Sequence, residues 1–135
     1  MRSSYVSIAL NPTLDELLSA INVGFQHFKL KTPTVTMELV GPIHRDPYVK
    51  GETESEWCWV SIDENPVDER MPGAKKYMGA VSTRGDDVFA ALVTYSLCKI
   101  FGESIYDDAG YVNAGQEFTL AEFEEALQAK LDSRI

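Results

Sequence analysis

The spacing of apolar residues changes twice within the first 40 residues, and this change constrains the fold more than any other feature of the sequence. Apolar residues alternate with other residues over 5–10, as in a β-strand, and recur every three or four residues over 13–28, as in an amphipathic helix. Alternation returns over 34–40. Thr13 and Glu16 have the spacing of a capping box, so we expect the helix to begin there. The chain therefore mixes strands and helices from its start.

The remaining predicted elements follow the same two patterns. Alternation predicts strands at 57–62, 77–83 and 103–107, and helical spacing predicts a strongly apolar helix at 86–101. A terminal helix begins at a second capping box, which starts at Thr119. Because the apolar helix has few charges after its first turn, we expect it to be the central helix of the fold.

The order of these elements predicts the fold class. Two segments that contain several prolines and glycines, 41–55 and 63–74, are expected to be exposed loops. Gly102 is expected to end the apolar helix in the left-handed conformation. The predicted order is then β-α-β-β-β-α-β-α, within a single α+β domain of residues 1–135. We expect a mostly antiparallel sheet of about five strands with helices packed on one face, nearest to a ferredoxin-like arrangement with an additional strand and helix.

The negative charge of the chain, −9 in total, is concentrated in two stretches. Residues 86–125 carry nine acidic residues and one basic one, but helix starts and turns account for much of that charge. Residues 51–69, which we call the acidic segment, carry seven acidic residues, no basic residue and two tryptophans. These acids are Glu52, Glu54, Glu56, Asp63, Glu64, Asp68 and Glu69.

Two interpretations of the acidic segment remain open. Acidic loops keep a small protein soluble, and that alone would explain them. Acids beside large aromatic side chains are also typical of a surface that attracts and anchors a basic protein. In this second interpretation Trp57 or Trp59 is the anchor, whichever faces outward, and Tyr48 is a secondary contact.

Few residues in the sequence favour catalysis or metal binding. The two histidines, His27 and His44, stand apart, and Cys58 and Cys98 lack the paired spacing of a zinc site, so we expect both thiols to be buried and reduced. No phosphate-binding loop or nucleophile elbow is present. We therefore predict no metal, no cofactor and no catalytic residue, although two of the many acids could still meet as an acid–base pair.

The sequence also bears on location and on classes of partner. No apolar run approaches the roughly 20 residues of a membrane helix, and the N-terminus does not have the pattern of a signal peptide. A negative surface repels phosphate, which argues against nucleic acid as the partner. We therefore expect a cytoplasmic protein that binds neither membranes nor nucleic acid.

The second half of the chain resembles a pattern seen in bacterial immunity proteins. Residues 86–131 combine a helix of small and apolar residues, a Phe101-Gly102 pair, the segment Ser104-Ile105-Tyr106-Asp107-Asp108 and a capped final helix. Immunity proteins of this kind, including those of contact-dependent inhibition systems, are small acidic cytoplasmic partners that neutralise toxins from neighbouring cells. The resemblance implies that the chain binds a cognate protein toxin.

Physical reasoning on charge agrees with this expectation. Many such toxins are nucleases, which must be basic to hold phosphate, and a concentrated negative surface would associate with them quickly. Two alternatives remain. One is a nucleic-acid mimic that inhibits a host or phage DNA-binding protein, and the other is a small enzyme or ligand-binding domain with a pocket between sheet and helices.

Overall fold

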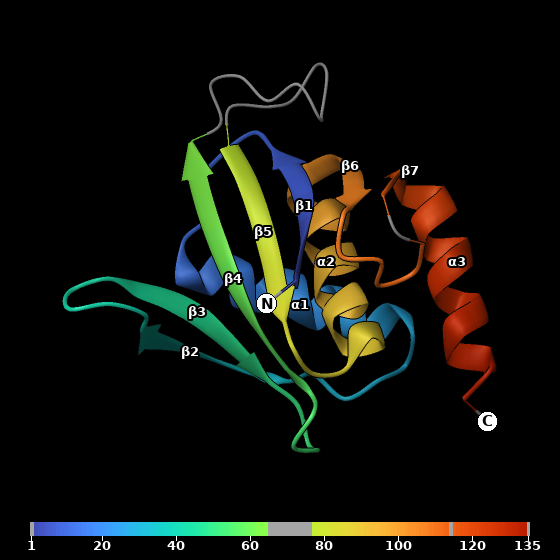
Figure 1. Ribbon diagram of the computed structural model, residues 1–135, viewed down its shortest axis with the longest axis horizontal. Coiled ribbons are helices and arrows are strands. Elements are labelled where there is room, and N and C mark those ends of the chain that lie inside the picture. Colours follow the sequence, from blue (N-terminus) through green and yellow to red (C-terminus); the bar gives the residue numbers. More distant parts are fainter. Residues whose placement is uncertain (1, 65–76, 114, 135) are drawn as a thin grey trace.

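The computed structural model describes residues 2–64, 77–113 and 115–134. These residues form three helices and seven strands in the order β-α-β-β-β-β-α-β-β-α (Figure 1). The predicted α+β class is confirmed, whereas the predicted number of about five strands is wrong because two strands were missed. The elements are β1 (Arg2–Ile8), α1 (Leu14–His27), β2 (Thr34–Leu39), β3 (Arg45–Lys50), β4 (Trp57–Glu64), β5 (Tyr77–Thr83), α2 (Asp87–Phe101), β6 (Gly102–Asp107), β7 (Gln116–Thr119) and α3 (Leu120–Asp132).

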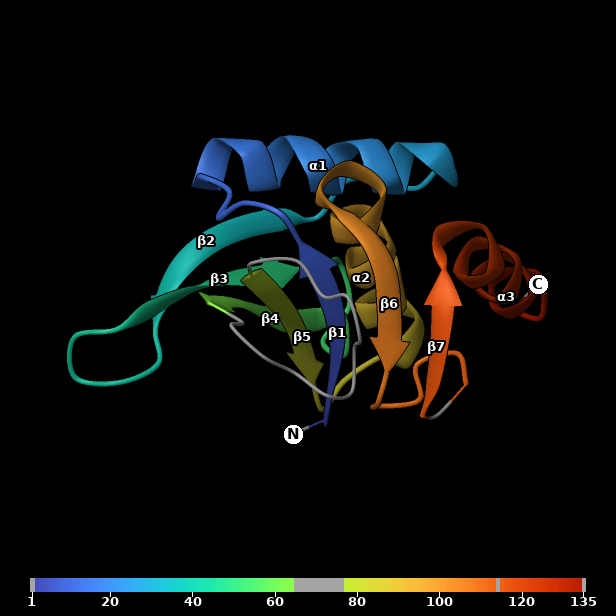
Figure 2. The ribbon, with the colours of Figure 1, turned by 90° about the horizontal axis from the view of Figure 1, so that it is seen from above.

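All seven strands belong to one sheet with the order β2-β3-β4-β5-β1-β6-β7, and each neighbouring pair is antiparallel. β1 therefore separates β5 from β6, and α2 joins these two parallel strands. Strands β4, β5, β1 and β6, with α1 and α2, have the β-α-β-β-α-β connectivity of a ferredoxin-like unit. The β2–β3 hairpin extends this unit at one end, and β7 with α3 extends it at the other (Figure 2).

β3 lies within the segment 41–55, which was wrongly predicted to be a loop. Proline cannot donate a hydrogen bond to a neighbouring strand, so Pro47 concealed the strand in the sequence. β3 pairs with β2 along its whole length but with β4 only from Tyr48 to Lys50. Pro47 therefore lies at a position where β3 is not paired with β4, so its missing N–H does not interrupt the β3–β4 pairing. β7 was missed because it has only four residues.

The predicted helix starts are confirmed. Thr13 Oγ1 accepts a hydrogen bond from the Glu16 N–H over 3.2 Å, and Glu16 Oε1 accepts one from the Thr13 N–H over 3.0 Å. Thr119 and Glu122 form the same reciprocal pair at the start of α3. Asp86 caps α2, where its carboxylate accepts a backbone N–H of the first turn over 2.9 Å. Capping residues therefore mark the starts of all three helices.

The predicted conformation of Gly102 is wrong. Its backbone is extended, with φ −114° and ψ −179°, because β6 begins at Gly102 itself and the chain passes from helix to strand without a left-handed turn. A Cβ atom here would lie 2.6 Å from Val6 Cγ1 and 2.9 Å from the carbonyl oxygen of Ser7. Glycine is therefore required by the close approach of the α2–β6 junction to β1.

α2 is the central helix, as predicted. Every residue from Val88 to Cys98 is buried, because α2 packs against the sheet and against both other helices (Figures 1 and 2). α1 crosses α2 closely at Gly24, where an added Cβ would lie 2.8 Å from Ser96 Cα. The core side of the sheet faces α2, and alternate residues of each strand form the opposite face.

Candidate functional site

The acids of the acidic segment lie in two groups at opposite ends of β4. One group occupies the turn between β3 and β4, and the other lies at the last two positions of β4. The seven residue steps between the groups span roughly 23 Å of extended chain. The first group is Glu52, Glu54 and Glu56, the second is Asp63 and Glu64, and Asp68 and Glu69 lie outside the described residues.

Two of the three turn carboxylates already have partners within the fold. Glu56 Oε1 accepts the backbone N–H groups of Glu52 and Thr53, each over 3.0 Å, so this side chain holds the turn together. The Glu52 carboxylate lies 3.5 Å from the Lys31 ammonium group, an exposed and weak ion pair. Glu54 is exposed and has no hydrogen-bond or ion-pair partner among the described residues. Its charge is available to a partner, whereas that of Glu56 serves the turn.

Tyr48, Trp57 and Trp59 gather on the sheet face opposite α2. The β3–β4 register places Tyr48 directly beside Trp59. The ring centroid of Tyr48 lies 4.8 Å from that of Trp59 and 6.3 Å from that of Trp57. Each of the three side chains is partly exposed, while Cys58 between the tryptophans is buried on the core side. The alternation of this strand therefore separates a core side from a tryptophan side.

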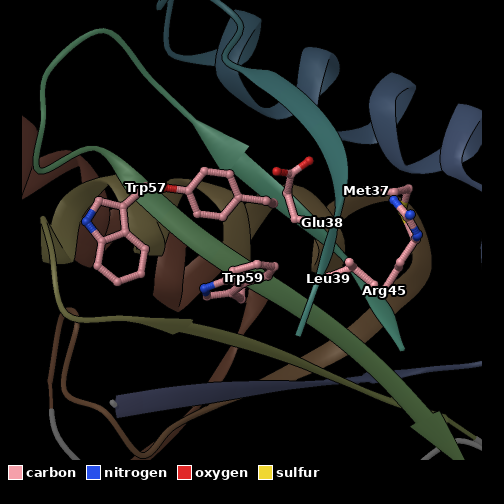
Figure 3. A pocket seen from close by; sticks show the side chains of 7 residues that line it. Met37, Glu38, Leu39, Arg45, Trp57 and Trp59 are labelled. Carbon is pink, nitrogen blue, oxygen red and sulfur yellow. The ribbon is translucent and has the colours of Figure 1, made fainter. Parts of the chain in front are cut away.

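A shallow hollow of about 630 Å³ lies between these rings and the β2–β3 hairpin (Figure 3). The hairpin projects from the body of the protein and twists, so side chains from both of its faces border the hollow (Figure 1). We call this feature the aromatic hollow. It is lined by Met37, Glu38, Leu39, Arg45, Tyr48, Trp57 and Trp59.

The predicted site residues did not include the four hairpin residues that line the aromatic hollow. Met37, Glu38 and Leu39 were placed in a strand but not in a site, and Arg45 was placed in a loop. One signal could have found them, because the Gly41-Pro42 turn stands between two segments able to pair as a hairpin.

The tip of the β2–β3 hairpin adds exposed apolar surface beside the hollow. Ile43 is 94% exposed, Leu39 is 55% exposed and Val40 is 46% exposed. Apolar side chains that are gathered and exposed in this way mark surfaces that bind other molecules. The aromatic hollow and the hairpin tip together form the candidate site.

Catalytic and metal sites find little support in the described residues. Among them, no three His, Cys, Asp or Glu side chains are grouped to hold a metal ion. His27 Nε2 lies 3.0 Å from a Glu124 carboxylate oxygen, and His44 Nε2 lies 2.9 Å from an Asp46 oxygen, at separate places in the fold. None of the described helices is long and apolar enough to cross a membrane.

The two cysteines are buried and unpaired in the fold, as predicted. Burial raises the pKa of the Cys58 thiol far above its ordinary range. Burial, with a smaller contribution from Glu103, raises the pKa of the Cys98 thiol to about 12. Thiols that stay protonated at neutral pH are poor nucleophiles. Neither thiol is therefore placed in the fold as a nucleophile.

Comparisons of the chain with protein-family models, with curated proteins and with solved structures found no match.

Proposed function

We propose that this chain is an inhibitory binding protein of the immunity type, which neutralises a basic toxin domain in the cytoplasm by forming a complex with it. One observation carries the proposal. Three aromatic side chains are collected on the sheet face opposite α2, partly exposed, in a hollow bordered by exposed apolar residues.

The aromatic hollow has the features of a binding hot spot. Tryptophan and tyrosine are enriched among the residues that dominate binding energy, since they bury a large area at a small cost in side-chain entropy. Tyr48, Trp57 and Trp59 support one another through ring contacts and therefore present a preorganised surface. A partner side chain that enters the hollow would displace water from all three rings.

The charge of the chain favours a basic partner. The net charge is −9, and exposed acids lie at both ends of β4, on either side of the tryptophans. Such a field increases the association rate with a cationic surface, and salt weakens the effect. A nuclease toxin fits this requirement because its active site must hold phosphate. The inhibitor would act by covering that site.

Co-expression tests the proposal directly. The partner to test is the C-terminal domain of any large secreted protein that a neighbouring gene encodes. The proposal predicts a stable complex and restored growth of cells that express the toxic domain. A domain that kills the cells equally in the presence of this chain, and does not co-purify with it, would contradict the proposal.

Variants locate the surface within that complex. Replacing Trp59 with Ala should weaken binding by at least about thirtyfold, the size expected for a hot-spot residue. The control is Ile100→Ala, which removes an exposed apolar side chain at the end of α2. Urea unfolding of both variants establishes whether each is folded, and Tyr48→Ala replaces Trp59→Ala if the latter is not. Equal affinities for the folded aromatic variant and the control would place the interface elsewhere.

Charge reversal tests the attraction separately. Glu54→Lys should slow association and flatten its dependence on salt, because Glu54 is exposed and has no partner among the described residues. Glu125→Lys makes the same change in net charge on the outer surface of α3 and is the matched control. Stopped-flow measurements at several salt concentrations compare the two variants.

A further inference from the structure

The two edges of the sheet differ in how they are protected. At one edge, β7 has four residues, and α3 follows it directly, with Phe118 of β7 against Phe123 of α3 at a ring separation of 5.4 Å. At the other edge, β2 has six residues and pairs only with β3 among the described strands. Five of its six side chains are exposed. β2 is therefore the open edge of the described sheet.

Apart from the single charge of Glu38, β2 lacks the devices that protect an exposed edge. Its sequence, Thr-Val-Thr-Met-Glu-Leu, contains no proline, lysine or glycine, and its pairing with β3 is regular over all six residues. Natural proteins commonly place prolines, lysines or bulges on such strands to prevent pairing with another chain. The outer N–H and C=O groups of β2 form a template for one additional strand.

A row of side chains leads from this edge to the aromatic hollow. The register places Thr36 beside Tyr48, Tyr48 beside Trp59 and Trp59 beside Ser82, all on the face opposite α2. Because threonine is small, a long side chain entering from the edge can pass over Thr36 and reach the Tyr48 ring. The spacing of two strands, about 10 Å, is near the reach of an arginine or lysine side chain.

Two carboxylates lie beside this row, at the next pair of positions on the same face toward the hairpin tip. Glu38 of β2 is directly opposite Asp46 of β3, on the same face as Thr36 and Tyr48. Like charges that face each other across two strands destabilise the pairing. His44 Nε2 lies 2.9 Å from Asp46 Oδ1, whereas Glu38 is exposed and has no ion-pair partner among the described residues. A cation placed between the two carboxylates would remove the repulsion.

We propose that an extended segment of the basic partner adds a strand to the outer edge of β2 and lays an arginine or lysine side chain over Thr36 onto Tyr48, between Glu38 and Asp46. This inference rests on the proposed binding function and specifies how the partner docks. The backbone pairing supplies affinity, and the cation on the aromatic ring between two acids supplies selectivity.

A second copy of this chain fits the edge less well. Pairing of β2 with another β2 brings no cation to the carboxylates, because Glu38 is the only charged residue of the strand. Two chains of charge −9 also repel each other. A basic partner brings a cation to the carboxylates, and the negative charge of the chain attracts it.

A defined peptide tests the docking mode without the toxin domain. The probe is an acetylated, amidated eight-residue peptide of alternating threonine and arginine. The control peptide has the same sequence with every backbone nitrogen methylated, which keeps the charge and removes the strand-forming donors on both edges of the peptide. We expect amide shifts in β2 and β3 in NMR spectra of the full chain. Binding of the methylated peptide should be at least about tenfold weaker.

A charge-matched pair of variants tests the cation. Glu38→Gln should reduce the affinity for the unmethylated peptide by about fivefold to tenfold, while Glu125→Gln on α3 should change it by less than about twofold. Both substitutions are at exposed positions and remove one negative charge. Equal effects of the two variants would overturn the role of the carboxylate pair.

Other outcomes also overturn the docking mode. Equal affinities for the two peptides would show binding by charge alone, and concentration-dependent shifts in β2 without peptide would identify a second copy as the occupant. Failure of the proposed function can be distinguished from failure of the docking mode. Peptide pairing at β2 without any toxin complex rejects the toxin-neutralising function alone. A toxin complex that is equally tight with Glu38→Gln and Glu125→Gln rejects strand addition alone.

Discussion

The sharpest stability prediction concerns Asp107, at the end of β6. Its side chain is completely buried and accepts four hydrogen bonds. Oδ1 accepts the Ser4 hydroxyl over 2.6 Å and the Tyr111 N–H over 3.0 Å, and Oδ2 accepts the N–H groups of Val112 and Asn113 over 2.8 Å each. The carboxylate thus closes the turn after β6.

The substitution Asp107→Asn keeps the shape of the side chain but supplies only one acceptor oxygen. In the more favourable of the two amide orientations, that oxygen still accepts hydrogen bonds from the N–H groups of Val112 and Asn113. These bonds are weaker because the acceptor is uncharged. The new amide NH₂ group faces the Tyr111 N–H, which is left buried without an acceptor. The weakened bonds and the orphaned donor together cost about 3–5 kcal/mol of unfolding free energy.

Urea unfolding followed by tryptophan fluorescence measures this cost. The matched control is Asp108→Asn, because Asp108 is exposed and has no hydrogen-bond partner among the described residues. We expect the control to change the free energy of unfolding by no more than about 0.5 kcal/mol. If the two variants differed by less than about 1 kcal/mol, the four bonds to Asp107 would not carry the stability that buried charge-assisted bonds should.

Three further predictions follow from the packing and charges. Burial opposes ionisation of Asp86, but the Arg134 guanidinium and backbone N–H groups lower its pKa below the ordinary 3.8 in the folded state. The ionised Asp86 side chain therefore stabilises the fold above pH 3.8, and this stabilisation is lost as the pH falls. Between about pH 7 and pH 3, the free energy of unfolding should therefore decrease less for Asp86→Asn than for the wild type. An equal decrease would contradict this prediction. Both thiols should resist iodoacetamide in the folded protein and react in urea, as mass spectrometry would show. Gly24→Ala should cost about 1–3 kcal/mol in urea unfolding, whereas Gly41→Ala, where an added Cβ meets nothing within 4 Å, should cost less than about 0.5 kcal/mol.

The helices were predictable because their signals are local. A capping box needs two residues three positions apart, and an amphipathic face needs only regular spacing, so α1 and α3 follow from neighbours in the chain. The strand β5 matched its predicted range, 77–83, for the same reason: alternation defines it without reference to a partner. Local patterns are sufficient to specify these elements.

The hairpin and the aromatic hollow depend on contacts between distant residues. Pro47 excludes a strand that is hydrogen-bonded on both sides, but whether β3 has a neighbour at that position depends on where β4 diverges. The same limit applies to Gly102, whose role depends on the nearness of Val6 rather than on its own backbone angles. The conformation at such positions depends on strand pairing and on close contact between segments that are distant in the chain. The sequence of a single segment shows neither.

Charge density along the chain is a weaker guide to a binding surface than the pairing of charges in the sheet. The acidic segment drew attention because seven acids stand close together, yet Glu56 uses its carboxylate to hold a turn. Glu38 and Asp46 come from residues 1–50, whose net charge is +1, and strand pairing brings them face to face. Repulsion between paired carboxylates costs stability in the isolated fold. A basic partner would recover that cost on binding, which makes this pair the more specific indication of where a cation should dock.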